Sequence, residues 1–267
     1  MEGLEKYLQN RKLILEHAFN MLKQELSVFP MFGAELEFYI NEDTQLPSSP
    51  HYEIVPEKGQ DQYEAQFDKC ADVLVLAGRL SDFHDQINAN FSSKPFASQP
   101  GSALHFHISL YDERGNNLFA KNGQEESGLL LHAVAGVCEY LPESMIFFAP
   151  DEAAYSRFVA GDNAPTHICW GGNNRSVAVR LPTALPIDRR IEHRVSGADA
   201  DPYLAFAAII FAIYSGISQK LVAPPRIYGN AYLPQYQLPE IAANFAQAMQ
   251  GFESSGKVKA CFESVGV

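Results

Sequence analysis

The sequence predicts an α+β fold built around a largely antiparallel sheet, and two patterns carry this prediction. Several short segments alternate polar and apolar residues, as half-buried strands do, because successive side chains point to opposite faces. Stretches of helical length lie between these segments at irregular intervals, without the regular strand–helix–strand repeat of a parallel sheet. The chain of 267 residues is long enough for one large core or two modest ones.

The first predicted element is an amphipathic helix over residues 3–26, where leucine and phenylalanine recur at spacings of three, four and seven. Pro30 ends it, and a strand over 33–40 follows. Residues 151–174 are rich in Gly, Asn and Pro and should be irregular. The other predicted elements, in chain order, are extended pieces around Glu53 and Glu64, a helix over about 68–87, a strand over 104–110, a helix over about 126–140 closed by Pro142, strands over 176–181 and 190–195, an apolar helix over about 202–221 and a short helix over about 241–252.

Side chains that can bind metals or phosphates gather on one face of the predicted strands. In the strand over 33–40, Glu35 and Glu37 alternate with apolar residues. A solvated sheet face would normally carry Thr, Ser and Lys as well. The same alternation places on one face His105, His107 and Ser109 in the strand over 104–110, Arg180 in the strand over 176–181, and Glu192 with Arg194 in the strand over 190–195.

These residue types indicate a divalent cation and a phosphate group. Hard cations such as Mg²⁺ prefer oxygen ligands, and Mn²⁺ also accepts an imidazole, so one His among several Glu favours Mg²⁺ or Mn²⁺ over Zn²⁺. Guanidinium groups match phosphate oxygens in pairs. The candidate cation ligands are Glu35, Glu37, Glu53, Glu64, His105 and Glu192. The candidate phosphate or carboxylate clamps are Arg157, Arg175, Arg180, Arg190 and Arg194. Cations and guanidinium groups around one site are typical of phosphoryl-transfer enzymes.

Composition excludes other classes of function. The net charge of −12 argues against a nucleic-acid surface, which would be basic. The four cysteines have no C-x-x-C spacing, which indicates reduced thiols rather than a zinc or disulfide framework. The N-terminal residues lack a signal-peptide pattern, and the most apolar run, residues 203–217, is shorter than the roughly 20 residues of a bilayer span. We expect a cytoplasmic protein without nucleic-acid or membrane partners.

Six motifs in order resemble the catalytic domain of the glutamine synthetase superfamily, and within it the γ-glutamyl–polyamine (amine) ligase type. Together they span about residues 31–255. They are Gly33-Ala34-Glu35-Leu36-Glu37-Phe38, His51-Tyr52-Glu53, Gln62-Tyr63-Glu64-Ala65-Gln66, the Pro100–Leu110 segment with His105, His107 and Ser109, the Ala164–Ser176 segment with Trp170 and Arg175, and Arg190-Ile191-Glu192-His193-Arg194 followed by Asp201-Pro202-Tyr203-Leu204.

The resemblance implies a fold, a reaction and residue roles. The fold would be a curved, mainly antiparallel sheet with helices on its convex face and the site on its concave face. ATP would phosphorylate a γ-carboxylate, glutamate in the family, and an amine would attack the acyl phosphate to form an amide. By this resemblance Glu35, Glu192 and His105 would hold the nucleotide-side metal, and Glu37, Glu53 and Glu64 would hold the other metal. ATP would be bound by His107, Ser109 and Arg190. The transferred phosphate would be bound by Arg175 and Arg194, and the substrate carboxylate or a phosphate by Arg157 and Arg180.

The chain also departs from the family pattern. It begins one helix before the Glu35 strand, so we expect a single catalytic domain, residues 1–267, without the family's small β-grasp domain, in a small homo-oligomer or with a different partner subunit. Aligning Gly59-Gln60 with the family's G-Q would put Gln62, rather than Glu64, at the third acid position. The alternative function is therefore a non-catalytic nucleotide- or metal-binding protein, or a regulatory one completed by a partner.

Overall fold

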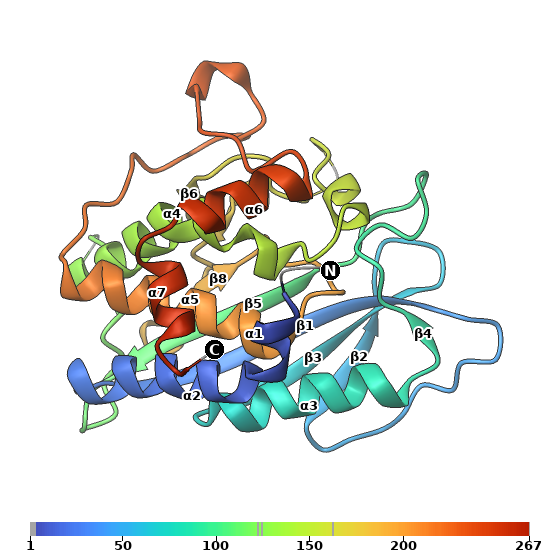
Figure 1. Ribbon diagram of the computed structural model, residues 1–267, viewed down its shortest axis with the longest axis horizontal. Helices are drawn as coiled ribbons and strands as arrows, with labels where there is room; N and C mark the ends of the chain where they lie inside the picture. The colour runs from blue at the N-terminus through green and yellow to red at the C-terminus, as the bar shows by residue number, and fades with distance from the viewer. Residues whose placement is uncertain (1–3, 122, 124, 162, 267) are drawn as a thin grey trace.

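A mixed sheet organises the computed structural model, which describes residues 4–121, 123, 125–161 and 163–266. Its strands pair in the order β2-β3-β1-β5-β8-β7-β6, with β4 beside β1 (Figure 1). The pairings are antiparallel except that of β6 with β7, which confirms the predicted α+β class. The strands are β1 (Phe29–Ile40), β2 (Tyr52–Pro56), β3 (Gln62–Cys70), β4 (Ala89–Asn90), β5 (Leu104–Tyr111), β6 (Trp170–Gly171), β7 (Val179–Arg180) and β8 (Ile191–His193).

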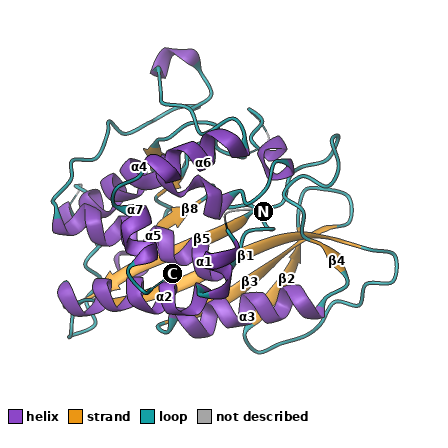
Figure 2. Ribbon diagram, in the orientation of Figure 1, coloured by secondary structure: helices purple, strands orange, loops and turns teal. Residues whose placement is uncertain are grey.

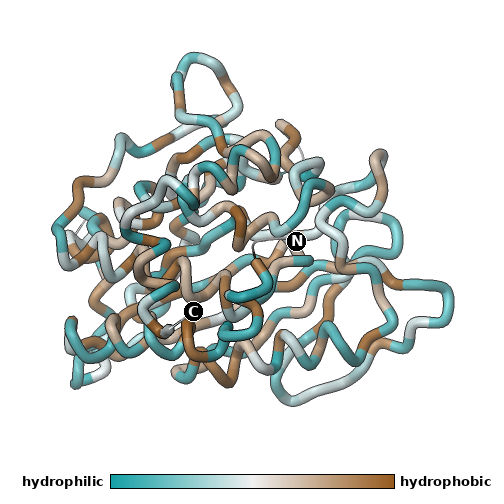
Figure 3. The backbone as a smooth tube through the Cα atoms, viewed as in Figure 1, coloured by the Kyte–Doolittle hydropathy of each residue, from teal (hydrophilic) through white to brown (hydrophobic). Residues whose placement is uncertain are grey.

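Helices cover one face of this sheet (Figure 2). The alternate apolar residues of β1 and β5 form that face and are buried under the helices. Phe106 of β5, for example, packs against Phe206 with ring centroids 4.3 Å apart. The loop after β1, by contrast, is mostly hydrophilic (Figure 3). The helices are α1 (Glu5–Gln9), α2 (Arg11–Asn20), α3 (Val73–Gln86), α4 (Gly128–Phe148), α5 (Pro202–Ser218), α6 (Phe245–Ser254) and α7 (Val258–Glu263).

The N-terminal helix forms as predicted but in pieces. Asn10 leaves helical geometry between α1 and α2, and a short π-helical stretch, Met21–Glu25, follows α2. Residue 3 lies outside the described residues. Strand β1 begins before its predicted start and includes Pro30, which pairs only with Leu110 of β5. Proline is tolerated there because β3 joins β1 only from Phe32 onward, so the missing N–H faces no second strand.

The predicted end of a helix at Pro142 is wrong. Helix α4 continues through Pro142 to Phe148, because most of its surface is buried against other helices and tertiary packing outweighs one lost backbone hydrogen bond. By length and apolarity α4 alone among the described helices would suit a membrane span, yet 67% of it is buried inside the fold. The strands predicted over 176–181 and 190–195 are shorter than expected, and β4, β6 and α7 were not predicted. Residues 151–174, predicted to be irregular, contain β6 and a short 3-10 helix, Ala153–Arg157.

Helices α4 and α5 touch backbone to backbone at two glycines. A Cβ added to Gly136 would lie 2.0 Å from the carbonyl oxygen of Ala212 and 2.8 Å from the Cα of Gly216. A Cβ added to Gly216 would lie 2.2 Å from the carbonyl oxygen of His132. No side-chain rotation relieves such contacts, because the obstructing atoms belong to the backbone. The two buried helices behind the sheet therefore depend on glycine at both positions.

We predict that Gly136→Ala destabilises the protein by about 1–3 kcal/mol, because a methyl group at this contact overpacks the core and outweighs the better helix propensity of alanine. The measurement is the free energy of unfolding from denaturant titration. Gly128→Ala is the matched control in the same helix, since an added Cβ there meets no atom within 4 Å. Equal effects of the two substitutions would contradict the packing argument.

Candidate active site

The pairing register brings the predicted polar residues together on the sheet face opposite the helices. On neighbouring strands, Glu35 of β1 lies opposite His105 of β5, and Glu37 lies opposite Glu64 of β3. Farther along the sheet, Glu192 of β8 lies between its paired residues on β5 and β7, His107 and Arg180. Residues separated by more than 150 positions in the sequence, such as Glu35 and Glu192, thus share one face of the sheet, which is what the alternation of each strand predicted.

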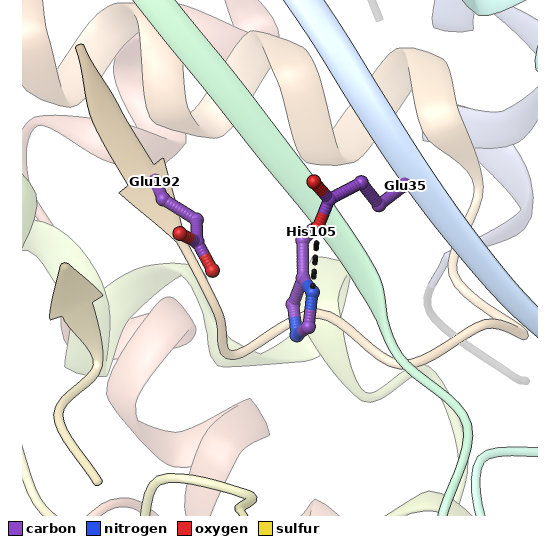
Figure 4. Close-up of side chains that lie close together, drawn as sticks. All are labelled: Glu35, His105 and Glu192. Carbon is purple, nitrogen blue, oxygen red and sulfur yellow. Dashed lines mark ion pairs between the residues drawn. The ribbon is translucent and has the colours of Figure 1, made fainter. Parts of the chain in front are cut away.

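Two groups of side chains are compact enough to hold a divalent cation. The first is Glu35, His105 and Glu192, whose potential ligand atoms all lie within 4.8 Å of one another. Figure 4 shows their side chains directed toward one another from β1, β5 and β8, with His105 Nδ1 3.5 Å from Glu35 Oε2. The second is Glu37, Glu64 and His105, within the same span. His105 belongs to both groups and marks the centre of the cluster.

Burial and mutual repulsion set the protonation of the cluster. Burial raises the pKa of Glu37 to about 8, against the opposing hydrogen bond that its carboxylate accepts from the Ala103 N–H. Burial and the negative charge of Glu35 raise the pKa of Glu64 to about 7. For Glu35 itself, burial favours a higher pKa, but its contacts with His105 and the neighbouring imidazole hold the pKa well below its ordinary range. Glu37 and Glu64 are thus carboxylates whose charge is destabilised without a nearby cation.

The donor set fits Mg²⁺ or Mn²⁺. Burial and the charge of Arg194 lower the pKa of His105 to about 4, so its imidazole is neutral at pH 7, as a metal ligand must be. His105 Nδ1 is buried and makes no hydrogen bond with the described residues; its contact with the Glu35 carboxylate, at 3.5 Å, is a long one. An orphaned buried nitrogen surrounded by carboxylate oxygens is best explained as a ligand atom. Oxygen donors with one imidazole match these two cations.

Four arginines also line this cavity, whose volume is about 380 Å³, and we call them the arginine wall: Arg175, Arg180, Arg190 and Arg194. Glu192 meets two of them: Arg180 Nη1 donates to one carboxylate oxygen at 2.7 Å, and Arg194 Nη1 donates to the other. Burial favours a higher pKa for Glu192, but Arg194 and the other nearby cations lower it. Arg175 lies exposed at the rim. We call this the polarised cavity, because both carboxylates and guanidinium groups line it and the two kinds of charge meet at Glu192.

A second cavity, of about 450 Å³, adjoins the first along β1 and β5. His107, Ser109 and Arg190 line it, and Arg190 and Glu35 line both cavities. Arg190 Nε donates to His107 Nδ1 at 3.1 Å, and the Ser109 hydroxyl donates to the Arg189 carbonyl at 3.1 Å. The residues that the sequence predicted beside a nucleotide thus lie together, next to the candidate metal cluster.

Three predicted positions lie apart from the cluster. Glu53 is exposed on β2 and lines only the second cavity. Arg157 is buried, and its guanidinium donates to the backbone carbonyls of residues 194–196 rather than facing the cavity. Gln62 is occupied by the Gly59 N–H and the Gly101 carbonyl, so Glu64, not Gln62, is the acid that joins the cluster.

The structure also shows lining residues that the sequence prediction missed. Glu57 and Asn173 line the polarised cavity and were not predicted; Asn163 also lines it, at the position where the motif resemblance places a Glu of glutamine synthetases. Glu57 could have been found, because it follows Glu53 at a spacing of four and therefore shares its face of an extended chain. Asn163 and Asn173 lie in irregular segments, where no periodicity predicts the direction of a side chain.

Residues 82–265 match the protein family described as the glutamine synthetase catalytic domain. The chain belongs to this family. The assignment confirms the resemblance of the sequence motifs, and the fold agrees with it: the structure titled GmaS/ADP complex superposes with a TM-score of 0.81 over 96% of this chain and 70% of that one, at 22% identity.

Curated relatives include both amine ligases and glutamine synthetases. Gamma-glutamylputrescine synthetase PuuA of Escherichia coli K12 is 37% identical over 209 residues, covering 75% of this chain and 44% of that protein. Glutamine synthetase of Thermus thermophilus is 32% identical, covering 68% and 42%. Gamma-glutamylethanolamide synthetase GlnA4 of Streptomyces coelicolor is 35% identical, covering 61% and 34%. The chain thus spans less than half the length of these relatives.

We predict that the family's acid cluster binds Mn²⁺ in the isolated protein, and that Glu64→Gln weakens binding by about tenfold or more, since loss of even an outer-shell partner costs about 10–100-fold. Calorimetry or the spin-resonance signal of free Mn²⁺ measures the affinity. Glu53→Gln is the matched control, because Glu53 is an exposed Glu outside both groups. A larger effect of Glu53→Gln than of Glu64→Gln would contradict this assignment.

Proposed function

We propose that this chain carries an ATP-dependent ligase activity that joins a glutamate-like carboxylate to an amine through an acyl phosphate. One observation carries the proposal: two overlapping groups of carboxylates with one imidazole, each compact enough for a divalent cation, line the same cavity as the arginine wall. Phosphoryl transfer needs this pairing, because cations and guanidinium groups together offset the charge that spreads over the transferring group. Membership of the glutamine synthetase family supports the same reaction.

In this proposal the strands hold the cations. Glu35, His105 and Glu192 hold one Mg²⁺ or Mn²⁺, and Glu37, Glu64 and His105 hold or adjoin the other. Bound there, the cations would neutralise phosphate oxygens and orient them for in-line transfer. His107, Ser109 and Arg190, which line the second cavity, bind ATP beside the cluster, and the Arg190 Nε–His107 Nδ1 and Ser109–Arg189 carbonyl hydrogen bonds hold them in place.

The guanidinium groups act on the transferring group. A substrate carboxylate oxygen attacks the γ-phosphorus of ATP, the bond to the β,γ-bridging oxygen breaks, and ADP leaves. A neutral amine then attacks the acyl carbon, the C–O bond to phosphate breaks, and the nitrogen gives up one proton. Arg175 and Arg194 stabilise the phosphoryl group in both steps, and Arg180 holds the carboxylate or a phosphate. Arg157 supports this wall from behind by fixing the backbone of Arg194.

A second candidate is a non-catalytic member of the family that binds a nucleotide or metal and regulates, or is completed by, a partner subunit. The observation that favours it is the pairing of both oxygens of Glu192 with Arg180 and Arg194, which compete with a cation for that carboxylate. We favour the ligase because neither Glu37 nor Glu64 meets an arginine or a lysine among the described ion pairs, so a cation would have no competitor there. We further propose a cytoplasmic small homo-oligomer acting on small-molecule carboxylates and amines in nitrogen metabolism.

We predict phosphate release from ATP and Mg²⁺ in the presence of glutamate and an amine, measured against a panel of polyamines, ethanolamine and ammonia. Glu192→Gln should abolish it, and Arg175→Met should lower kcat by about 100-fold or more, as loss of one transition-state donor does. Arg114→Met is the control, because Arg114 is exposed in the turn after β5 and lines neither cavity. Tight ADP binding without turnover on any substrate pair would support the non-catalytic alternative instead.

A further inference from the structure

Three cations converge on one carboxylate outside the cavity. The side chain of Glu126, just before the first turn of α4, is only 6% exposed. Arg189 Nη2 donates to both of its oxygens, at 2.5 and 2.6 Å. Arg226 Nη1 donates at 3.3 Å, and Lys121 Nζ lies 3.5 Å away. Because the buried Glu126 carboxylate accepts hydrogen bonds from both Arg189 and Arg226, it links the two segments of the chain that carry these arginines.

The first segment leads into β8 and carries part of the cavity wall. Arg189 Nη1 donates to the carbonyl of Pro182 at 3.1 Å, which closes residues 182–189 into a loop. Pro182 and Thr183 line the polarised cavity, and the residue after Arg189 is Arg190, which lines both cavities. Fixing Arg189 therefore fixes the start of β8 and the approach of Arg190.

The second segment backs the residues around Arg175. The Arg226 guanidinium lies over the rings of Trp170 and Tyr228 and against Gly172, where an added Cβ would be 2.2 Å from Nη2. The next residue, Ile227, donates its N–H to the Trp170 carbonyl at 3.0 Å. Residues 171–175, which include the cavity residues Asn173 and Arg175, follow directly after Trp170. Fixing Arg226 therefore fixes the base of that loop.

We propose that Glu126 is a positioning residue that sets the two arginine-bearing segments, 182–190 and 171–175, at their working separation. The proposal rests on the proposed function, because that function gives these arginines a phosphate to bind. Charge is essential to the role: a neutral side chain would leave two guanidinium groups, one of them buried, facing each other without a counterion. Glu126 touches neither cavity, so it acts only through Arg189 and Arg226.

Hydrogen exchange measures the positioning without relying on activity. In Glu126→Gln, amides of 182–190 and 171–175 should exchange about tenfold faster or more, while those of β1 and β5 should not change. Arg226→Gln removes the more exposed of the two arginines and provides a folded protein if Glu126→Gln does not fold. In this variant only the amides of 171–175 and 226–231 should exchange faster. Glu126→Asp keeps the charge and should have a smaller effect. The matched control is Glu125→Gln, since Glu125 is the exposed neighbour.

Ligand binding separates positioning from plain stability. With Mg²⁺, the affinity of Glu126→Gln for ADP should fall about 10–100-fold, while Mn²⁺ binding by the acid cluster stays within about twofold. The double variant with Arg226→Gln should be less than additive, because both changes break one contact. Unchanged exchange in both segments, or faster exchange with unchanged ADP affinity, would overturn the proposal. A wild type that binds no ADP would contradict the proposed function alone, because exchange still tests the anchor.

Discussion

The pairing register of β1 with β3 and β5 is the constraint on which the rest of the site depends. It sets Glu35 opposite His105 and Glu37 opposite Glu64, while the alternate residues of the same strands enter the core. A slip by one residue would turn the acids into the core and the apolar side chains into the cavity. The buried aromatic side chains under the sheet therefore hold the register that the chemistry needs, and stability and function are fixed by the same alternation.

The cluster is costly for the folded chain. Glu37 and Glu64 lie close enough to share a cation with His105, and burial raises the pKa of both acids. Desolvated carboxylates facing each other destabilise the fold unless a cation or a proton offsets them. Arg180 and Arg194 of the arginine wall do not neutralise Glu37 and Glu64, because both arginines form their ion pairs with Glu192. The site is thus built for an added positive charge near Glu37 and for an added negative charge near Arg175.

The sequence predicted what depends on period-two alternation and on motif order: the α+β class, the shared face of Glu35, His105 and Glu192, and the family. It failed where position is set by distant neighbours. Glu53 points to the correct face, but no local signal shows that β2 lies at the sheet edge. Arg157 has the residue type expected of a phosphate clamp, but its guanidinium donates its hydrogen bonds to backbone carbonyls about 38 residues later in the sequence. Proline tends to end a helix, but burial of α4 outweighs this tendency at Pro142.

The acids and the arginines of the site are held in place by different interactions. Strands position the acids, and hydrogen bonds along β1 and β5 leave them little freedom. Most of the arginine wall lies instead at strand ends and in loops between 171 and 190, where few backbone bonds fix it. A loop that must hold guanidinium groups near one another, before any phosphate neutralises them, needs a counter-charge from the protein itself. Glu192 supplies it inside the cavity, and Glu126 supplies it behind the wall. In the proposed ligase, a rigid cation-binding half and a charge-anchored anion-binding half would let the second half adjust to the transferring group without disturbing the first.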